Sequence, residues 1–410
     1  MDFEDTPEEA AIRAEARAWL DAHAIPKGHA DDFSAGMWSN EYSEETYVKR
    51  CREWQGVLAE GGWAGVTWPK EFGGRGGRPV EGTVFNQEQA RYGVSNGVFA
   101  IAIGMVGPTL LAHGTDDQKA RYLPPMLRGD EVWCQLFSEP EAGSDLAAVT
   151  TKAVLDGDEW VVTGQKVWTS AAHRAEWGIL LARTDPEVPK HKGITYFLVD
   201  MASPGIEIRP LRQMTGDAHF SEVFLDEVRI PTANVLGEVG EGWRVAQTTL
   251  ASERTAIAGG SGGADPPGLI AMAQQLGRAD DPLVRQAVVE AHLRSELLRF
   301  LRLRAQTAVS QGTRPGAETS VMKLAYARFM QQMTTTAIHV QGAMAMLNEP
   351  ELLPRGGVWT TKFLHSPSLR IAGGSDQIQG NIIGERVLGL PAEARADKDT
   401  PFRDLAKATR

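Results

Sequence analysis

Two hydroxyl-bearing stretches carry side chains suited to a ligand rich in hydrogen-bond acceptors. They are Phe137-Ser138-Glu139-Pro140-Glu141-Ala142-Gly143-Ser144-Asp145 and Gly164-Gln165-Lys166-Val167-Trp168-Thr169-Ser170. Pro140 fixes φ and removes a donor, whereas Gly143 permits a close approach of the backbone to a ligand. The hydroxyls of Ser138 and Ser144 and nearby backbone N–H groups can therefore meet acceptors, while Trp168 adds an aromatic ring. Either stretch alone would also suit a surface loop followed by a half-buried strand.

The segments around these stretches predict a small antiparallel β domain. The hydrophobic run 132–137 precedes the first stretch, and the hairpin turn Asp156-Gly157-Asp158 precedes the second. Further β-rich runs are separated by Gly, Asp and Pro, as is typical of strands. They are Thr151–Leu155, Trp160–Thr163, Gly178–Ala182, Ile194–Val199, Ile206–Pro210 and Ser221–Leu225.

Helical patterns fill the chain on both sides of this domain. Thr6-Pro7-Glu8-Glu9 has the N-cap, proline and acidic first turn of a helix start, and Asp281-Pro282 begins a second long helix. The Gly-rich run 259–268 is interpreted as a flexible turn. We therefore predict an α+β fold with an N-terminal helical domain (1–130), a β-barrel-like middle domain (131–240) and a C-terminal four-helix-bundle domain (241–410).

Composition excludes several classes of function. The net charge of −11 argues against general nucleic-acid binding, and no apolar run is long enough to span a membrane. The nine histidines show no paired helical spacing and the two cysteines, Cys51 and Cys134, show no metal-ligand spacing, so we predict no metal site. An acidic N-terminus without a secretory signal and the scarcity of cysteine indicate a reducing, cytoplasmic location.

Taken together, the two hydroxyl-bearing stretches resemble the flavin-binding signatures of the acyl-CoA dehydrogenase family. Family-like segments follow the expected order along the chain: Trp68-Pro69-Lys70-Glu71-Phe72-Gly73-Gly74, the run 113–123, and Asp226-Glu227-Val228-Arg229-Ile230-Pro231. The resemblance implies FAD bound between the β domain and the C-terminal helices. It also implies removal of two hydrogens from an acyl-CoA, which gives the trans-2-enoyl thioester, with electrons passing to electron-transfer flavoprotein.

The resemblance assigns roles to single residues of this sequence. Ser138 matches the hydroxyl that bonds the flavin, with Phe137 supplying backbone contacts, and Trp168 matches the aromatic residue that packs on the isoalloxazine. Ser170 matches the hydroxyl near flavin N5. The remaining matches are Ser144, at the position that meets coenzyme A and cofactor, and Ser375 and Gln377, which reach FAD from the last helix. No role is claimed for Gln135, which stands where a flavin-side aromatic residue is frequent.

Two departures from the family pattern affect the site. The Arg-x-x-Phe-Gly motif that grips the FAD pyrophosphate from a neighbouring subunit has no clear match, because Ala279-Asp280-Asp281 follows Arg278. The catalytic Glu of the Tyr-Glu-Gly-Thr turn is also missing, since Ala372-Gly373-Gly374-Ser375 occupies that turn. The small residues there imply room for a branched, cyclic or long acyl chain.

Glu253 is the carboxylate that we predict to replace the missing base. Leu250, Glu253 and Arg254 are similar to the Leu-x-x-Glu-Arg pattern of isovaleryl-CoA and several steroid-CoA dehydrogenases, whose base lies on that helix. Arg254 is then a substrate-binding candidate, which holds the helix or a phosphate. The alternatives are that Glu253 is a helix-surface residue paired with arginines, or that Asp376 is the base.

Other functions and assemblies stay open at this point. A catalytically silent subunit that completes the flavin site of a paired dehydrogenase would suit the weak pyrophosphate grip and the lost turn Glu. A flavin oxidase or monooxygenase on the same fold would need no carboxylate base. The resemblance implies a homotetramer or an α2β2 heterotetramer. The basic run Lys190-His191-Lys192 is interpreted as a solvated hairpin end in preference to a coenzyme A clamp.

Overall fold

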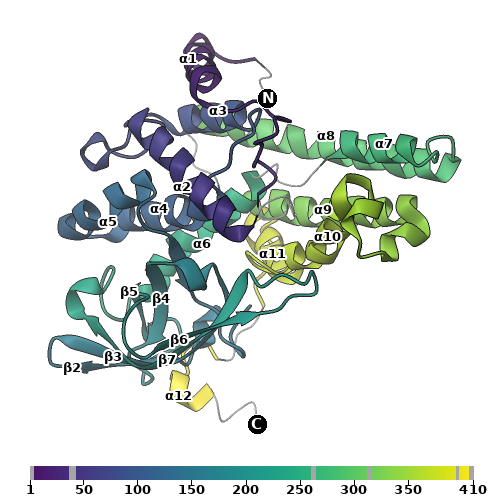
Figure 1. Ribbon diagram of the computed structural model, residues 1–410. Helices are drawn as coiled ribbons and strands as arrows, with labels where there is room; N and C mark the ends of the chain where they lie inside the picture. Colours follow the sequence, from purple (N-terminus) through teal and green to yellow (C-terminus); the bar gives the residue numbers. More distant parts are fainter. Residues whose placement is uncertain (1–3, 37–42, 260–264, 312–315, 394–396, 406–410) are drawn as a thin grey trace. The chain divides into compact units, whose positions relative to one another are not determined.

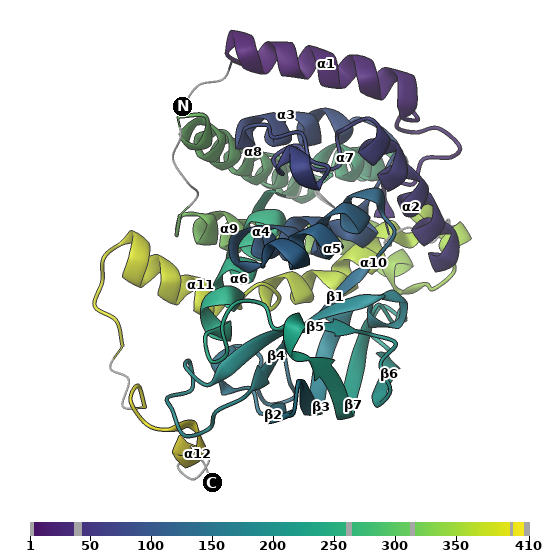
Figure 2. The same cartoon turned by 90° about the vertical axis from the view of Figure 1, so that its left-hand side faces the viewer.

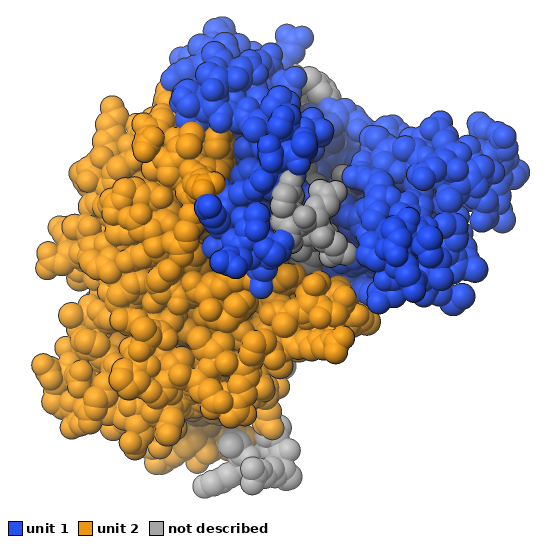
Figure 3. All heavy atoms as spheres, viewed as in Figure 1, with its two compact units in different colours: residues 1–50, 77–95, 254–391 blue, residues 51–76, 96–253, 392–410 orange. Residues whose placement is uncertain are grey.

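The structure is a computed structural model that describes residues 4–36, 43–259, 265–311, 316–393 and 397–405. Packing divides the chain into two compact units (Figure 3). Unit 1 comprises residues 1–50, 77–95 and 254–391, and unit 2 comprises residues 51–76, 96–253 and 392–410. Two of the boundaries fall inside helices, at residues 50/51 in α2 (Glu44–Glu60) and at residues 253/254 in α6 (Gly242–Gly259). The three domains expected from the sequence, divided at residues 130 and 240, remain a prediction.

Unit 2 contains the β domain, in which the described residues form one seven-stranded sheet (Figure 1). The strands are β1 (Trp133–Leu136), β2 (Lys152–Asp156), β3 (Glu159–Ser170), β4 (Trp177–Arg183), β5 (Ile194–Asp200), β6 (Ile206–Leu211) and β7 (Phe220–Pro231). Their order is β1-β4-β2-β3-β7-β6, and β5 pairs with β4. All the predicted strands are present, and the turn at Gly157 joins β2 to β3 with a positive φ of 68°.

The sheet is mixed, which differs from the antiparallel domain expected from the sequence. Most pairings are antiparallel, but β1 runs parallel to β4 over four residue pairs. Strands β4 and β5 are buried at almost every position, as strands covered on both faces are. The edge strand β6 is half-exposed and carries Pro210, which cannot donate a ladder hydrogen bond.

Short helices of unit 2 pack on the sheet and complete its core. They are a π-helical turn at Ala102–Val106, α4 (Gly107–His113) and α5 (Asp116–Arg128), which begins with a capping box at Thr115. Leu110, Leu123 and Met126 are fully buried in one cluster with Trp133 of β1 and Leu181 of β4. This apolar contact explains why the second half of the predicted N-terminal helical lobe packs with the β domain.

Unit 1 is helical, and apolar residues of its central helix form its core. Its main helices are α1 (Pro7–His23), α3 (Pro79–Gln89), α7 (Pro266–Gln275), α8 (Pro282–Ser310), α9 (Thr319–Gln341), α10 (Val358–His365) and α11 (Asp376–Ile382), with α3 beside α8 in Figure 2. Met322, Phe329 and Met333 of α9 are buried. Part of the predicted turn at 259–268 is wrong, because Asp265 caps Gly268 N and starts α7; residues 260–264 lie outside the described part.

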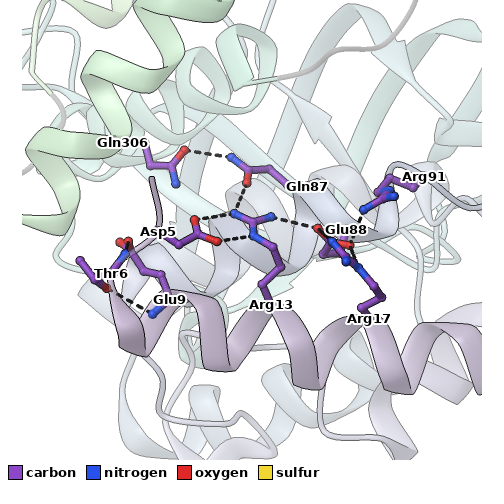
Figure 4. Close-up of polar contacts among 9 residues, drawn as sticks. All are labelled: Asp5, Thr6, Glu9, Arg13, Arg17, Gln87, Glu88, Arg91 and Gln306. Carbon is purple, nitrogen blue, oxygen red and sulfur yellow. Dashed lines mark hydrogen bonds and ion pairs between the residues drawn. The ribbon is translucent and has the colours of Figure 1, made fainter. Parts of the chain in front are cut away.

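Helix α1 is held on α3 by one buried carboxylate (Figure 4). Glu88 is 3% exposed and pairs with Arg13, Arg17 and Arg91, each at 3.0–3.1 Å. The predicted helix start at Thr6 is confirmed, since its hydroxyl accepts from Glu9 N at 3.2 Å and the Glu9 carboxylate accepts from Thr6 N at 2.8 Å. The N-terminal helix is therefore fastened by charge as well as by apolar packing.

Candidate active site

The loop that carries Ser138 is fixed by a buried ion pair that sequence analysis did not find. The Lys166 ammonium, 0% exposed, lies 2.8 Å from Glu139 Oε1 and donates to the Phe137 carbonyl at 3.1 Å. Glu139 also accepts from Thr150 N, Thr150 Oγ1 and Thr151 N at 2.7–2.9 Å. The turn Glu139–Ala142 closes with two backbone hydrogen bonds. This loop is thus rigidly connected to β3.

The charges of this pair are set by burial and by each other. Although burial alone raises the pKa of Glu139, Lys166 and the threonine donors lower it to about 2. Burial lowers the pKa of Lys166 to about 8 against the attraction of Glu139. Both groups are therefore charged at neutral pH. A sequence signal existed, because Lys166 occupies an inward position of a strand that otherwise alternates.

Trp168 lies at a β-bulge and presents its ring to the surface. The register between β3 and β7 shifts between Lys166 and Thr169, so one extra residue is accommodated there. Trp168 takes φ 60°, an outlier for a bulky residue, and its side chain is 60% exposed. Its ring meets the Phe220 ring edge-on at 5.9 Å. Strain of this kind persists where the surrounding structure imposes it, and it concentrates at ligand sites.

The structure brings part of the predicted cofactor set together within unit 2. Val167 N donates to the Ser138 carbonyl at 2.9 Å, so Ser138 lies beside Trp168, and Ser170 follows on the same strand. Ser138 and Ser170 are half-buried, whereas Ser144, two residues after the Glu139–Ala142 turn, is exposed. Phe137 is 3% exposed, with its ring packed edge-on against Tyr196. An exposed indole whose neighbour Val167 bonds the Ser138 backbone, two residues before Ser170, suits a flat, acceptor-rich group such as an isoalloxazine.

Helix α6 holds Glu253, and hydrogen bonds fix that helix within unit 2. The Thr249 hydroxyl, fully buried, contacts the hydroxyls of Thr109 at 2.9 Å and Tyr196 at 3.0 Å. His113 Nε2 lies 2.8 Å from the Thr248 hydroxyl. Glu253 is four residues beyond Thr249, so both project from the same side of the helix. Glu253 is half-buried, and so is Arg254, at which the chain returns to unit 1.

The last turn belongs to unit 1 and holds the other predicted cofactor residues. Ser375 caps α11, because its hydroxyl accepts from Ile378 N at 3.3 Å, while Gln377 is exposed. Gly373 takes φ 63° and Gly374 φ 89°, a conformation that would cost a Glu about 1–2 kcal/mol. The backbone of this turn therefore suits the glycines that replace the family's Glu.

Asp376, the alternative base, is already committed to two arginines. Its Oδ2 accepts from Arg370 at 2.6 Å and from Arg328 at 3.3 Å, and its side chain is 7% exposed. Burial opposes ionisation, but these two guanidinium groups hold the pKa of Asp376 below its usual value. Asp376 is therefore a poor proton acceptor near neutral pH. Arg278, the residue nearest in sequence to the missing pyrophosphate motif, is itself engaged, because it donates to Asp281 at 3.3 Å.

Two other sequence interpretations change or gain detail in the structure. Lys190 is not a solvated hairpin end: it is 16% exposed and bonds Asp145 at 2.8 Å. Among the described residues, no group of three or more His, Cys, Asp or Glu side chains could hold a metal ion, and no helix could cross a membrane. Cys51 and Cys134 are buried free thiols.

Comparison with known proteins matches the chain to one family along almost its whole length. The acyl-CoA dehydrogenase N-terminal, middle and C-terminal domains match residues 6–130, 134–228 and 240–388. Acyl-CoA dehydrogenase IpdE1 of Mycolicibacterium smegmatis is 38% identical over 399 residues, covering 94% of this chain and 98% of that protein. Acyl-CoA dehydrogenase FadE34 of Mycobacterium tuberculosis is 44% identical over 340 residues, 82% of this chain but only 46% of that longer protein.

A solved structure gives the same relationship in three dimensions. The Tcur3481-Tcur3483 steroid ACAD superposes with a TM-score of 0.81 at 30% identity, covering 96% of this chain and all of that one. The agreement extends over the helical segments and the β domain alike. On the domain matches, the full-length relative and this structure, the chain belongs to the acyl-CoA dehydrogenase family, as its two hydroxyl-bearing stretches predicted.

Proposed function

We propose that this protein catalyses the FAD-dependent α,β-dehydrogenation of an acyl-CoA thioester and passes the electrons to electron-transfer flavoprotein. The observation that carries the proposal is the exposed Trp168 side chain, held in a left-handed backbone conformation next to Val167, which bonds the Ser138 carbonyl, and two residues before Ser170. FAD, when bound, supplies the acceptor for the hydride that leaves the β-carbon. Ser138 and Ser170 would hold it by hydrogen bonds, Trp168 by ring packing, and Ser375 and Gln377 would serve a flavin from the last turn.

Glu253 is the residue that we propose to remove the α-proton. It is half-buried on a helix fixed by Thr248 and Thr249, whereas Asp376 is held ionised by Arg370 and Arg328. A carboxylate enclosed by substrate loses solvation, which raises its pKa toward the working pH and makes it a better base. Arg254 points about 100° away around the helix, so it holds a phosphate or the helix and leaves Glu253 basic.

Glu253→Gln tests this assignment because it keeps size and polarity and removes basicity. Loss of a general base costs about 10²–10⁴-fold in rate, so anaerobic flavin bleaching by an acyl-CoA should slow by that factor while FAD content persists. Glu241→Gln is the matched control, since Glu241 is 51% exposed one residue before the same helix and its carboxylate lies 3.7 Å from Arg244. Unchanged bleaching in the Glu253 variant would assign the base to another residue. A parent that binds FAD but is reduced by no thioester would instead identify a silent partner subunit.

We propose a bulky acyl group, such as a polycyclic or branched chain, as the substrate. Ala372, Gly373 and Gly374 put little side-chain volume at the turn where the family resemblance places Tyr and Glu. The similarity to a protein described as a steroid ACAD supports the same class. A panel of acyl-CoA thioesters should show faster flavin reduction by cyclic and branched members than by butyryl-CoA. A clear preference for butyryl-CoA would rule the proposal out.

We propose that another chain of the same fold covers an apolar stripe on α8. Val289, Leu293 and Leu297 follow one another at helical spacing and are 55%, 56% and 62% exposed in this chain. Such a stripe is costly in water, and the last-turn residues of the family serve a neighbouring subunit's flavin. Light scattering of the purified protein should give the mass of a dimer or tetramer, and Leu293→Glu should lower the measured mass of the assembly. A monomeric parent that retains FAD would contradict this assembly.

A further inference from the structure

The C-terminal segment 397–405 is docked on the loop that joins β4 to β5 in unit 2. Phe402 N donates to the Val188 carbonyl and Arg403 N to the Pro186 carbonyl, both at 3.0 Å. Pro189 and Pro401 form a β-bridge, and Arg403 pairs with Glu187. The helix α12 (Phe402–Leu405) accordingly lies beside the sheet in Figures 1 and 2. This docking consists of backbone and side-chain contacts and does not depend on unit 1.

Arg183, at the end of β4, connects this docked segment to the end of the Ser144 loop. Its side chain is almost completely buried, at 4% exposed. The guanidinium donates to the carbonyls of Ala147 at 2.6 Å and Val149 at 3.2 Å, and to the Lys190 carbonyl at 2.7 Å. Its carbon Cζ lies 3.8 Å from the centre of the Phe402 ring. One cation thus joins three segments that are distant in sequence.

Lys190 makes a second connection between the C-terminal segment and the Ser144 loop, through Asp145, the residue after Ser144. Its ammonium lies 2.8 Å from Asp145 Oδ2 and 3.1 Å from Asp397 Oδ2. The backbone of this loop is closed further by Ala148 N, which donates to the Asp145 carbonyl at 2.9 Å. The loop is therefore held at Asp145 and again at Ala147 and Val149, and both connections lead to the C-terminal segment.

We infer that the C-terminal segment 397–405 positions the loop that binds coenzyme A, and that Lys190 and Arg183 are positioning residues for Ser144. The inference rests on the proposed function and on the role that the family resemblance implies for Ser144, which is to meet the coenzyme A part of the thioester. It deepens that function by making a segment remote in sequence part of substrate binding. Ser138 is held by a different set of contacts, because Lys166 bonds Glu139 and the Phe137 carbonyl, whereas Lys190 bonds Asp145 and Asp397.

Phe402→Ala tests the inference, because it removes the ring under Arg183 and leaves every charge in place. On the full-length FAD-loaded protein, calorimetric titration with free coenzyme A should give a Kd about three- to tenfold higher, as expected when a loop loses one or two ordering contacts. Lys190→Met should raise the same Kd, whereas the Kd for FAD should not change in either variant. The matched control is Arg403→Ala, whose pair with Glu187 joins two side chains that are each more than half exposed.

Hydrogen exchange supplies a readout that does not need the ligand. Amides of residues 146–149 should exchange faster in Phe402→Ala and Lys190→Met than in the parent and the Arg403 control. Faster exchange at 397–405 alone, with the loop and the coenzyme A Kd unchanged, would overturn the inference. If the Phe402 variant does not fold, Lys190→Met carries the test. A parent that fails to bind coenzyme A would instead defeat the proposed function, and the exchange data would still decide whether the segment orders the loop.

Discussion

Replacing Glu139 by Gln should strongly destabilise the β domain, because it leaves the Lys166 ammonium without a carboxylate. Lys166 is 0% exposed and would keep the Phe137 carbonyl at 3.1 Å as its remaining strong acceptor. Breaking a buried ion pair from one side typically costs about 3–5 kcal/mol. The protein can limit this cost by releasing the lysine proton, since a neutral amine tolerates burial.

The free-energy cost of neutralising each group when it is buried alone follows from its ordinary pKa and the pH. Discharging a lysine whose ordinary pKa is 10.5 at pH 7 costs about 5 kcal/mol, at 1.36 kcal/mol per pKa unit. The reverse variant, Lys166→Met, leaves Glu139, which can accept a proton instead. Protonating a carboxyl of ordinary pKa 4.5 at pH 7 costs about 3 kcal/mol, and Glu139 also keeps three donors from Thr150 and Thr151. Glu139→Gln should therefore be the more damaging change, and the double variant should be less damaging than Glu139→Gln.

The two single variants should also respond to pH in opposite directions. In Glu139→Gln, folded Lys166 is neutral while the unfolded chain binds the proton below pH 10.5, so stability rises with pH by up to about 1.4 kcal/mol per unit. In Lys166→Met, folded Glu139 holds a proton that the unfolded chain releases above pH 4.5, so stability rises as pH falls. Urea unfolding of the four proteins between pH 5.5 and 8, followed by tryptophan fluorescence, measures both effects. Additive single effects, or equal pH slopes, would refute the reasoning.

Two further predictions concern other parts of the chain. Burial opposes the ionisation of Glu88, but hydrogen bonds from Arg17 and Arg13 hold its pKa below the ordinary value. Docking of α1 should therefore be complete above about pH 4.5 and weaken as the pH falls further. Glu88→Gln should weaken the protection of α1 amides in hydrogen exchange at pH 7 and abolish that acid dependence. Trp168→Gly removes a left-handed strain of about 1–2 kcal/mol together with an aromatic contact of about 0.5–1.5 kcal/mol, so apoprotein stability should change by no more than about 1.5 kcal/mol. The same variant should bind FAD at least about tenfold more weakly by fluorescence titration, and unaltered FAD affinity would contradict the role of the ring.

Local patterns predicted the parts of the structure that depend on neighbouring residues. The helix start at Thr6, the hairpin turn at Gly157 and the strands of the β domain follow from capping, turn chemistry and alternation, which act over a few residues. The Ser138 and Trp168 stretches pointed to the family for the same reason, because each is one continuous segment. The roles predicted for Glu253 and for the cofactor residues remain to be tested by the variants above.

Packing between distant segments could not be predicted from those patterns. The parallel pairing of β1 with β4, the joining of Glu139 to Lys166, and the contact of Arg183 with Phe402 each depend on which residues meet after folding. A lysine in a strand or an aspartate before a loop has many partners available along the chain, and only the burial of the surrounding apolar surface selects one. The sequence by itself therefore determined the elements and the family of this protein. The tertiary structure decided which charges are buried together, because the cost of burying a charge is set by the groups that folding brings within hydrogen-bonding distance.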